Sequence, residues 1–199
     1  NNYLEIQCKE TSNSMNIRLF TLPNLLTLAN LLSGAAAVIA VLVHHSYETA
    51  LWLIVAAALF DFFDGFVARL LHQSSPLGVQ LDSLADDVTF GVAPSMIVFS
   101  LFKEVTVPSF LLPVSEYVPY AAFFIAVFSA LRLAKFNIDT RQTSSFIGVP
   151  TPANALFWGS LVVGAHDFLV SDSFNALYLI ILVAFTSWLL VAEIPMFSL

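Results

Sequence analysis

The chain has 199 residues, of which 58% are hydrophobic and only 11% are charged. A soluble domain carries about a quarter charged residues, so this composition excludes an ordinary soluble globular protein. The formal net charge of −7 argues against nucleic acid as a partner, because nucleic-acid-binding proteins present clustered positive charge. The single cysteine, Cys8, has no partner for an internal disulfide.

The N-terminal segment differs from everything that follows it. Residues 1–14 are polar, whereas the sequence from Met15 onward is strongly apolar. We therefore interpret residues 1–14 as an arm outside the fold and residues 15–199 as one transmembrane domain. Residues 15–22, in which Arg18 stands among apolar neighbours, predict a short interfacial helix.

Long apolar segments dominate the rest of the chain. A membrane-spanning helix needs about 20 mostly apolar residues, and six segments reach or approach that length. We predict an all-α, multi-pass membrane protein with six transmembrane helices, at roughly residues 24–44, 49–71, 79–102, 117–136, 152–168 and 174–191.

The basic residues predict the orientation. If the N-terminus is cytoplasmic, the outer connections hold only Lys103. The inner segments hold all the other basic residues: Lys9, Arg18, Arg69, Arg132, Lys135 and Arg141. This distribution satisfies the positive-inside rule. It also places residues 61–86 near the cytoplasmic face.

Four aspartates stand inside or beside the second and third predicted spans, where ionised groups are costly and indicate function. Asp61 and Asp64 are three residues apart, and Asp82 and Asp86 are four apart, so each pair shares one face of its helix. The two helices are antiparallel neighbours joined by a tight connection. The pairs should therefore converge into one group of carboxylates, which we call the carboxylate box.

Four unpaired carboxylates at such a distance would repel one another. Divalent cations would remove this repulsion, and oxygen-only ligands favour Mg²⁺ or Mn²⁺ over zinc. Carboxylate-bound Mg²⁺ usually has a phosphate partner. The alternatives are acids that cap a helix or form salt bridges, and the proton relay of an ion-coupled transporter. Such transporters typically contain internal repeats, and we find none in this sequence.

The spacing of the box residues forms a longer motif, D-x-x-D-G-x-x-A-R-x8-G-x-x-x-D-x-x-x-D, which runs from Asp61 to Asp86 with every fixed position filled. In this motif, and along most of its length from Leu22, the chain resembles the CDP-alcohol phosphatidyltransferases. That resemblance implies attack by an alcohol on the phosphorus of a CDP-linked lipid, with CMP as the leaving group. It also implies a homodimer.

The resemblance assigns roles to particular residues. Asp61, Asp64, Asp82 and Asp86 are expected to hold two divalent ions, and Asp86 is also expected to take the proton of the acceptor. The residues expected to contact CDP-diacylglycerol are Gly65, Ala68, Arg69, Ser75 and Gly78. Thr27 and Asn30 are candidates for the nucleotide pocket, with a helix–helix hydrogen bond as the alternative.

Further sequence segments resemble the phosphatidylserine synthase branch of the family, among them residues 23–30, 81–94, 132–137 and 146–153. L-Serine is therefore the expected acceptor, with glycerol 3-phosphate or inositol phosphate as the alternative. The phrase at 81–94 departs from that branch, because Asp87 and Thr89 stand where an apolar residue and a serine are expected.

A serine acceptor needs one cation for its carboxylate, whereas a phosphorylated alcohol needs more. The candidates for acceptor binding are Arg132, Lys135, Arg141 and Asn154. Arg132 lies a turn inside its predicted span, which favours a polar cavity. Lys135 and Arg141 have positive-inside residues at headgroup level as their alternative.

Asp87 adds a fifth acid directly after the motif. Adjacent helix positions point about 100° apart, so Asp86 and Asp87 cannot both face the box. We interpret Asp87 as a supporting residue of the site or as part of a helix interface.

Overall fold

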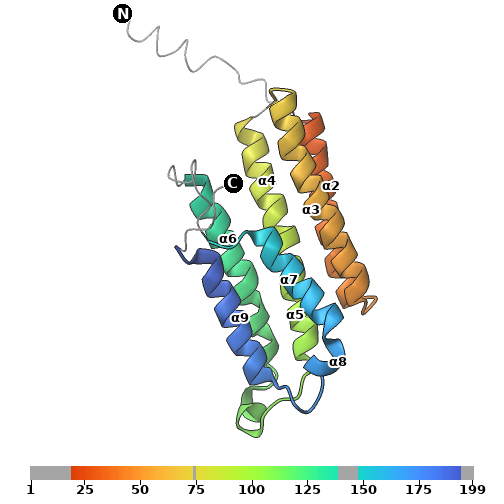
Figure 1. The fold of residues 1–199 in the computed structure, drawn as a ribbon, viewed down its shortest axis with the longest axis vertical. Coiled ribbons are helices and arrows are strands. Elements are labelled where there is room, and N and C mark those ends of the chain that lie inside the picture. Colours follow the sequence, from red (N-terminus) through yellow and green to blue (C-terminus); the bar gives the residue numbers. More distant parts are fainter. Residues whose placement is uncertain (1–18, 74, 139–147, 194–199) are drawn as a thin grey trace, which may run out of the picture.

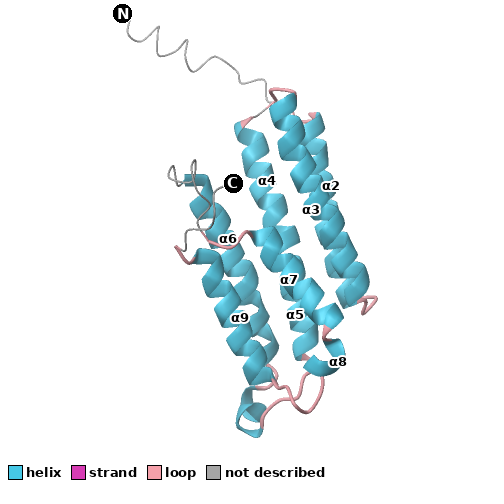
Figure 2. Cartoon of the chain, in the orientation of Figure 1, coloured by secondary structure: helices cyan, strands magenta, loops and turns pink. Residues whose placement is uncertain are grey.

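The structure is a computed structural model that describes residues 19–73, 75–138 and 148–193. Within these ranges every regular element is helical, and no strand occurs (Figure 2). The predicted all-α class is therefore confirmed. Residues 1–14, residues 15–18 of the predicted interfacial helix, and Arg141 lie outside the described ranges. Residues 19–21, which follow directly, are not helical.

Helices α2 (Leu22–Leu42) and α3 (Tyr47–Leu70) form an antiparallel hairpin with extensive contact along its length (Figure 1). Thr21 caps α2 by accepting a hydrogen bond from the Asn24 backbone N–H, and a proline occupies the first turn, where its missing N–H costs nothing. Ser46 caps α3 in the same way, through the Thr49 N–H. These caps are local sequence features, so both helices begin within two residues of their predicted starts.

The third predicted span is a continuous helical segment of 27 residues whose geometry changes midway. It comprises α4 (Pro76–Asp86), the π-helical segment η1 (Asp87–Val92) and α5 (Ala93–Phe102). The sequence pattern predicted its extent but not the π segment. A π turn inserts an extra residue into the helical repeat and often occurs at functional sites. Here it begins directly after Asp86.

The remaining helices form the other side of the bundle. The 3₁₀ segment η2 (Ser109–Val114) lies in the connection after α5. The 3₁₀ segment η3 (Val118–Ala122) leads into α6 (Phe123–Ile138). They are followed by α7 (Thr151–Gly164), the short α8 (His166–Leu169) and α9 (Ala176–Val191). Helices α6 and α9 pack together, and α7 packs against α3 and α5 (Figure 1).

Among the described residues, four helical segments are long and apolar enough to cross a membrane: Leu22–Leu42, Tyr47–Leu70, Pro76–Phe102 and Val118–Ile138. The chain is thus a multi-pass membrane protein. The last two predicted spans are shorter than expected, because α7 has 14 residues and ends before Ala165, and α9 has 16. Residues 152–168 are therefore not one continuous helix.

The core lies between the hairpin, the third helical segment and α7. Trp158, Phe90, Ile54 and Ile97 are fully buried in it. The Trp158 indole Nε1–H donates to the hydroxyl of Thr186 at 3.2 Å, which ties α7 to α9 and satisfies the one polar atom of a buried indole. This core fixes the positions of α3 and of the α4–η1 segment, which carry the acids.

Candidate active site

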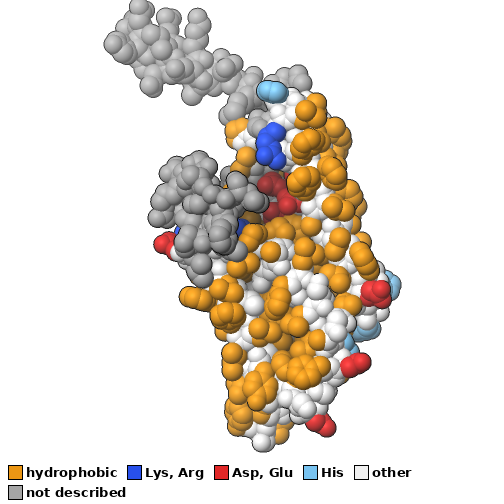
Figure 3. Space-filling model, viewed as in Figure 1, with side chains coloured by type: hydrophobic (Ala, Val, Ile, Leu, Met, Phe, Trp, Pro, Cys, Tyr) orange, Lys and Arg blue, Asp and Glu red, His pale blue; other side chains and the backbone are white. Residues whose placement is uncertain are grey.

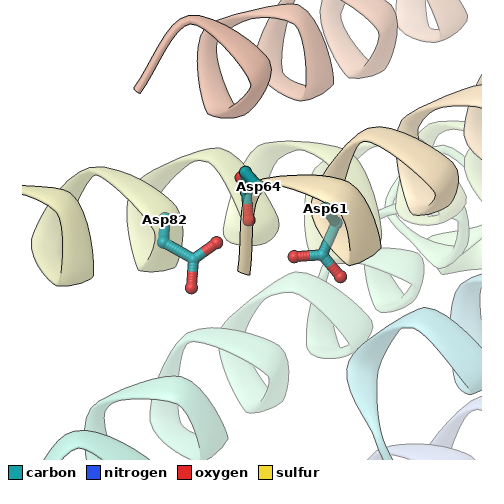
Figure 4. A group of neighbouring side chains, drawn as sticks. All are labelled: Asp61, Asp64 and Asp82. Atoms are coloured by element: carbon teal, nitrogen blue, oxygen red, sulfur yellow. The ribbon is translucent and has the colours of Figure 1, made fainter. Parts of the chain in front are cut away.

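The four predicted box residues come from two neighbouring helices. Asp61 and Asp64 lie in the second half of α3, and Asp82 and Asp86 lie in α4. One carboxylate oxygen from each of Asp61, Asp64 and Asp82 falls within 4.8 Å of the others. Figure 4 shows these three side chains pointing into the same space between the helices. In the space-filling view, acidic side chains are visible in a hollow of the surface where α4 lies in Figure 1 (Figure 3).

Asp86 is the last residue of α4 and is buried, with 8% of its surface exposed. It lies outside the 4.8 Å trio, but its carboxylate is beside that of Asp61. The Asn30 side-chain Nδ2–H donates to its Oδ1 at 3.0 Å. The fourth acid therefore extends the box toward η1.

Helix α2 donates two hydrogen bonds to the carboxylates of the box. The Thr27 hydroxyl donates to Asp64 Oδ2 at 2.6 Å, and Asn30 donates to Asp86 as described above. Thr27 and Asn30 are three residues apart on α2, so they share one face of the helix. Both side chains form helix–helix hydrogen bonds, which was the alternative to a place in the nucleotide pocket. In both bonds the acceptor is a carboxylate of the box. Hydrogen bonds of this kind orient metal ligands.

The box has the chemistry of a divalent-cation site. None of its four acids forms an ion pair with a basic side chain of the described residues. Asp82 Oδ1 is buried and has no hydrogen-bond partner there, although buried polar atoms are nearly always paired. Carboxylates that pair with no basic side chain of the described residues, one of them with a buried oxygen that accepts no hydrogen bond there, suit a hard divalent ion.

A cavity adjoins the box on the side of the α3–α4 connection. Its lining includes Pro23, Asn24, Asp64, Gly65, Ala68, Gln73, Gly78, Val79 and Asp82. It therefore brings together five motif residues that are expected to contact CDP-diacylglycerol or metal: Asp64, Gly65 and Ala68 from α3, and Gly78 and Asp82 from α4. Asn24 and Gln73, which line the same cavity, were not among the sequence candidates. Asn24 had a signal, because it lies one turn before Thr27 on the face of α2 that supports the box.

The small motif residues leave space at this cavity. No atom of the described residues lies within 4 Å of the point where a Cβ on Gly65 would stand. A Cβ on Gly78 would stand 3.4 Å from Asn24 Oδ1 and 3.3 Å from Ser75 Oγ. Gly65 therefore leaves the backbone of α3 accessible, and Gly78 lets α4 approach α2 closely.

Arg69 and Ser75 lie on either side of the connection between α3 and α4. The Arg69 Nε–H donates to the Gly65 carbonyl at 3.1 Å, which leaves the rest of its exposed guanidinium accessible. Ser75 caps α4, because its hydroxyl oxygen accepts from the Gly78 N–H at 3.0 Å. The N-terminus of α4 and Arg69 together put positive potential beside the cavity.

The candidates for acceptor binding lie in different surroundings. Arg132 on α6 is partly buried, and its Nε has no partner in the described residues. Asp86 is the acid whose charge acts on it, yet the two form no ion pair. Lys135 instead pairs with Glu193 at 2.8 Å on the surface. Asn154, in the first turn of α7, is 4% exposed, and its Nδ2 has no partner.

The fold and the site define a helical membrane protein with an oxygen-ligand centre beside a cavity. The sequence model of the CDP-alcohol phosphatidyltransferases matches residues 20–194. The chain therefore belongs to the CDP-alcohol phosphatidyltransferase family.

Several relatives carry the name CDP-diacylglycerol–serine O-phosphatidyltransferase. The Bacillus subtilis protein is 35% identical over 173 residues, which cover 87% of this chain and 88% of the relative. A Helicobacter pylori (strain J99) protein is 39% identical over 140 residues, which cover 69% of this chain and 55% of the relative. The Methanocaldococcus jannaschii protein is 31% identical over 165 residues, which cover 83% of this chain and 70% of the relative.

Proposed function

We propose that the chain transfers the phosphatidyl group of CDP-diacylglycerol to the hydroxyl of L-serine, which gives phosphatidylserine and CMP. The observation that carries this proposal is the convergence of Asp61, Asp64 and Asp82 within 4.8 Å beside a cavity. Family membership and the names of the relatives support the substrates.

The four box residues would hold two divalent ions, Mg²⁺ or Mn²⁺. These ions would offset the charge of the diphosphate and of the departing CMP oxygen. Thr27 and Asn30 keep two of the four carboxylates in position. Arg69 provides a fixed positive charge for a phosphate, and the open space at Gly65 lets that phosphate approach the backbone.

The chemistry requires one proton acceptor, and Asp86 is the residue we assign to it. The serine hydroxyl oxygen bonds to the phosphorus that carries diacylglycerol, the bond from that phosphorus to the CMP oxygen breaks, and the hydroxyl proton passes to Asp86. Asp86 is buried beside Asp61 and held by Asn30. A general base must lie within hydrogen-bond reach of the proton it takes, and Asp86 lies near enough to Arg132, the proposed ligand of the serine carboxylate, for its charge to act on that guanidinium.

L-Serine is a better fit than glycerol 3-phosphate or inositol phosphate. A phosphorylated acceptor needs several cations, whereas Arg132 is the one basic side chain of the described residues that combines burial near Asp86 with a free donor. Lys135 is paired with Glu193. The deciding experiment compares incorporation of radiolabelled serine, glycerol 3-phosphate and inositol phosphate into lipid by the purified protein. Absence of serine incorporation would overturn the assignment.

A second experiment tests the role of Asp86. Asp86→Asn keeps the shape of the side chain and removes its basicity, so CMP release should fall by about two to four orders of magnitude. Retention of CMP release by a folded variant would exclude Asp86 as the base. Wild-type CMP release also separates this proposal from an ion-coupled transporter, which would release none.

The membrane arrangement is part of the proposal. We infer six crossings, with α7 and α9 as the last two, and the box on the cytoplasmic side. Of the described basic residues, Arg69 and Lys135 are in the last turns of α3 and α6, and Arg132 lies one turn before Lys135. These two helices end toward the end of the bundle that holds the box, whereas α5, which Lys103 directly follows, ends toward the other (Figure 1). The homodimer implied by the resemblance stays a prediction, which native mass spectrometry in detergent would test.

A further inference from the structure

Asn24 holds its side-chain amide in one orientation beside the cavity that adjoins the box. It is the third residue of α2, is 3% exposed and belongs to the lining of that cavity. Its Nδ2–H donates to the Leu19 carbonyl at 2.9 Å. A flipped amide would place its oxygen against that carbonyl oxygen, and both atoms only accept hydrogen bonds. The Leu19 carbonyl therefore fixes the orientation of the amide.

The Asn24 Oδ1 atom is consequently an acceptor with a fixed position. It faces α4, because a Cβ on Gly78 would stand 3.4 Å from it, and Gly78 lines the same cavity. No group of the described residues donates a hydrogen bond to this oxygen. Gly65 and Gln73, which also line the cavity, are exposed. The cavity is therefore open to the surroundings, and a ligand that enters it can reach Oδ1.

The cavity has room for a single-ring base. Its volume of about 130 Å³ is about ten times the space that one buried water needs. The six-membered ring of a pyrimidine and its two substituents comprise fewer heavy atoms than that number of waters. The small side chain of Ala68 and the absence of one at Gly78 leave this space between α3 and α4.

The cavity lies one helical turn from the box, toward the connection between α3 and α4. Three helices each supply one residue to this level: Asn24, three residues before Thr27; Ala68, four after Asp64; and Gly78, four before Asp82. A donor whose diphosphate meets metal ions in the box has its nucleoside on one side and its acyl chains on the other. The acyl chains belong in the hydrocarbon core of the bilayer. The nucleoside therefore lies toward the helix ends, where this cavity is.

A fixed acceptor at this place distinguishes between the two common pyrimidine bases of RNA. Cytosine has an exocyclic amine, which donates hydrogen bonds, where uracil has a carbonyl oxygen, which accepts them. Opposite Asn24 Oδ1 the amine forms a hydrogen bond, whereas the carbonyl would bring two acceptors into contact. A site that is built to bond a donor rejects the analogue that lacks it.

We propose that Asn24 selects cytidine over uridine nucleotides by accepting a hydrogen bond from the exocyclic amine of the base. This inference rests on the proposed function only for the nucleotide of the donor. It does not depend on which alcohol is the acceptor.

Gln73 lies at the open side of the cavity but does not make this selection. The His72 N–H donates to the Arg69 carbonyl at 3.3 Å and the Gln73 N–H to the Ala68 carbonyl at 3.0 Å. With His72 at a φ of 53°, these bonds form a common C-terminal turn of a helix, which leads the chain past the cavity. The exposed Gln73 amide has no hydrogen-bond partner in the described residues. It can present either its donor or its acceptor to a base, so it favours neither.

The test measures binding of CMP and UMP to the purified protein in the presence of Mn²⁺ by isothermal titration calorimetry. The wild-type protein should bind CMP about tenfold or more tightly than UMP. Asn24→Leu keeps a similar shape and removes the acceptor, so CMP binding should weaken on the order of tenfold while UMP binding does not weaken. Gln73→Leu is the matched control, because it removes the other amide of the same cavity, and it should retain the wild-type preference.

The ratio of the two dissociation constants separates recognition of the base from a structural role. CMP and UMP share their ribose and phosphate, so a variant that disturbs the fold or the metal site weakens both equally. Thermal unfolding in detergent checks that each variant is folded. Asn24→Ser carries the test if Asn24→Leu does not fold, because a hydroxyl both donates and accepts and should also lower the preference for CMP.

The outcomes are distinguishable. A wild-type protein that binds neither nucleotide refutes the CDP-linked donor and this inference with it. Equal binding of CMP and UMP by the wild-type protein refutes the selection alone. A preference for CMP that persists in both Asn24 variants, or equal weakening of the two nucleotides, refutes the role of Asn24. Loss of the preference in those variants supports it, and does so even if serine proves not to be the acceptor.

Discussion

Thr27 and Asn30 connect the carboxylates to the scaffold at the scale of single residues. Each donates one hydrogen bond to an acid that lies far away in sequence, 37 residues from Thr27 and 56 from Asn30. The spacing of the aspartates predicted the box, because helical periodicity is a local property. The sequence did not determine which residues donate hydrogen bonds to the acids, because those contacts depend on how α2 packs against α3 and α4.

Replacement of Thr27 tests this support. Thr27→Val keeps the shape and removes the hydroxyl, so Asp64 loses the 2.6 Å hydrogen bond that orients it. Loss of a hydrogen bond behind a metal ligand typically costs about 10- to 100-fold in metal affinity. Titration of Mn²⁺ binding by electron paramagnetic resonance should show this loss. Thr27→Ser should restore the affinity, and a Thr27→Val protein with unchanged affinity would contradict the role.

Gly65→Ala should separate stability from substrate binding. The added methyl group meets no atom of the described residues within 4 Å, and alanine is favoured over glycine in a helix interior by about 1 kcal/mol. The melting temperature should therefore stay the same or rise. The KM for CDP-diacylglycerol should rise, because the methyl group projects into the space left for the phosphate. A lower melting temperature would show that Gly65 has a packing role instead.

At the scale of helices, the apolar segments and caps predicted most ends well. Helices α2 and α3 and the long third helical segment begin and end within about three residues of expectation, since proline and serine at their starts act locally. The π segment after Asp86 was not predictable, because its extra residue is stabilised by contacts with other helices. One of these is the hydrogen bond from the Thr89 hydroxyl to the Asn30 carbonyl at 3.2 Å.

Gly34 is the contact that lets α2 approach η1. A Cβ at position 34 would stand 2.2 Å from Thr89 Oγ1 and 2.7 Å from the Thr89 Cα, so the backbone of one helix would have to move. Gly34→Ala should lower the free energy of unfolding by about 1–3 kcal/mol, as overpacking does, despite the better helix propensity of alanine. Thermal unfolding in detergent measures this, with Gly164→Ala as the control because, in the part of the chain that the structure describes, nothing lies within 4 Å of its Cβ position. Equal melting temperatures for the two variants would contradict the close contact.

Over the whole molecule, the two ends of the bundle have different chemistry. The box and its cavity lie toward the end where α3 ends and α4 begins. At the other end, the Glu104 carboxylate accepts from the Tyr47 hydroxyl and contacts His166 Nε2 at 2.9 Å. These contacts join α3 and α8 to the connection that follows α5, far from the acids. The sequence predicted this polarity from its basic residues, although the brevity of α7 and α9 could not be read from hydropathy alone.

Labelling of single cysteines would test the orientation and the number of crossings together. The connections that contain Glu116 and Asp172 lie at the end of the bundle opposite the box, where the Ala176 N–H donates to the Thr106 carbonyl at 3.0 Å. Gln73 lies at the end with the box. The variants are made in a Cys8→Ser background. In intact cells a membrane-impermeant maleimide should label Glu116→Cys and Asp172→Cys, whereas it should label Gln73→Cys only after the membrane has been permeabilised. Because labelling at position 172 requires α7 to cross the bilayer, protection there with labelling at 116 would refute six crossings. Labelling of Gln73→Cys in intact cells would instead refute a cytoplasmic active site.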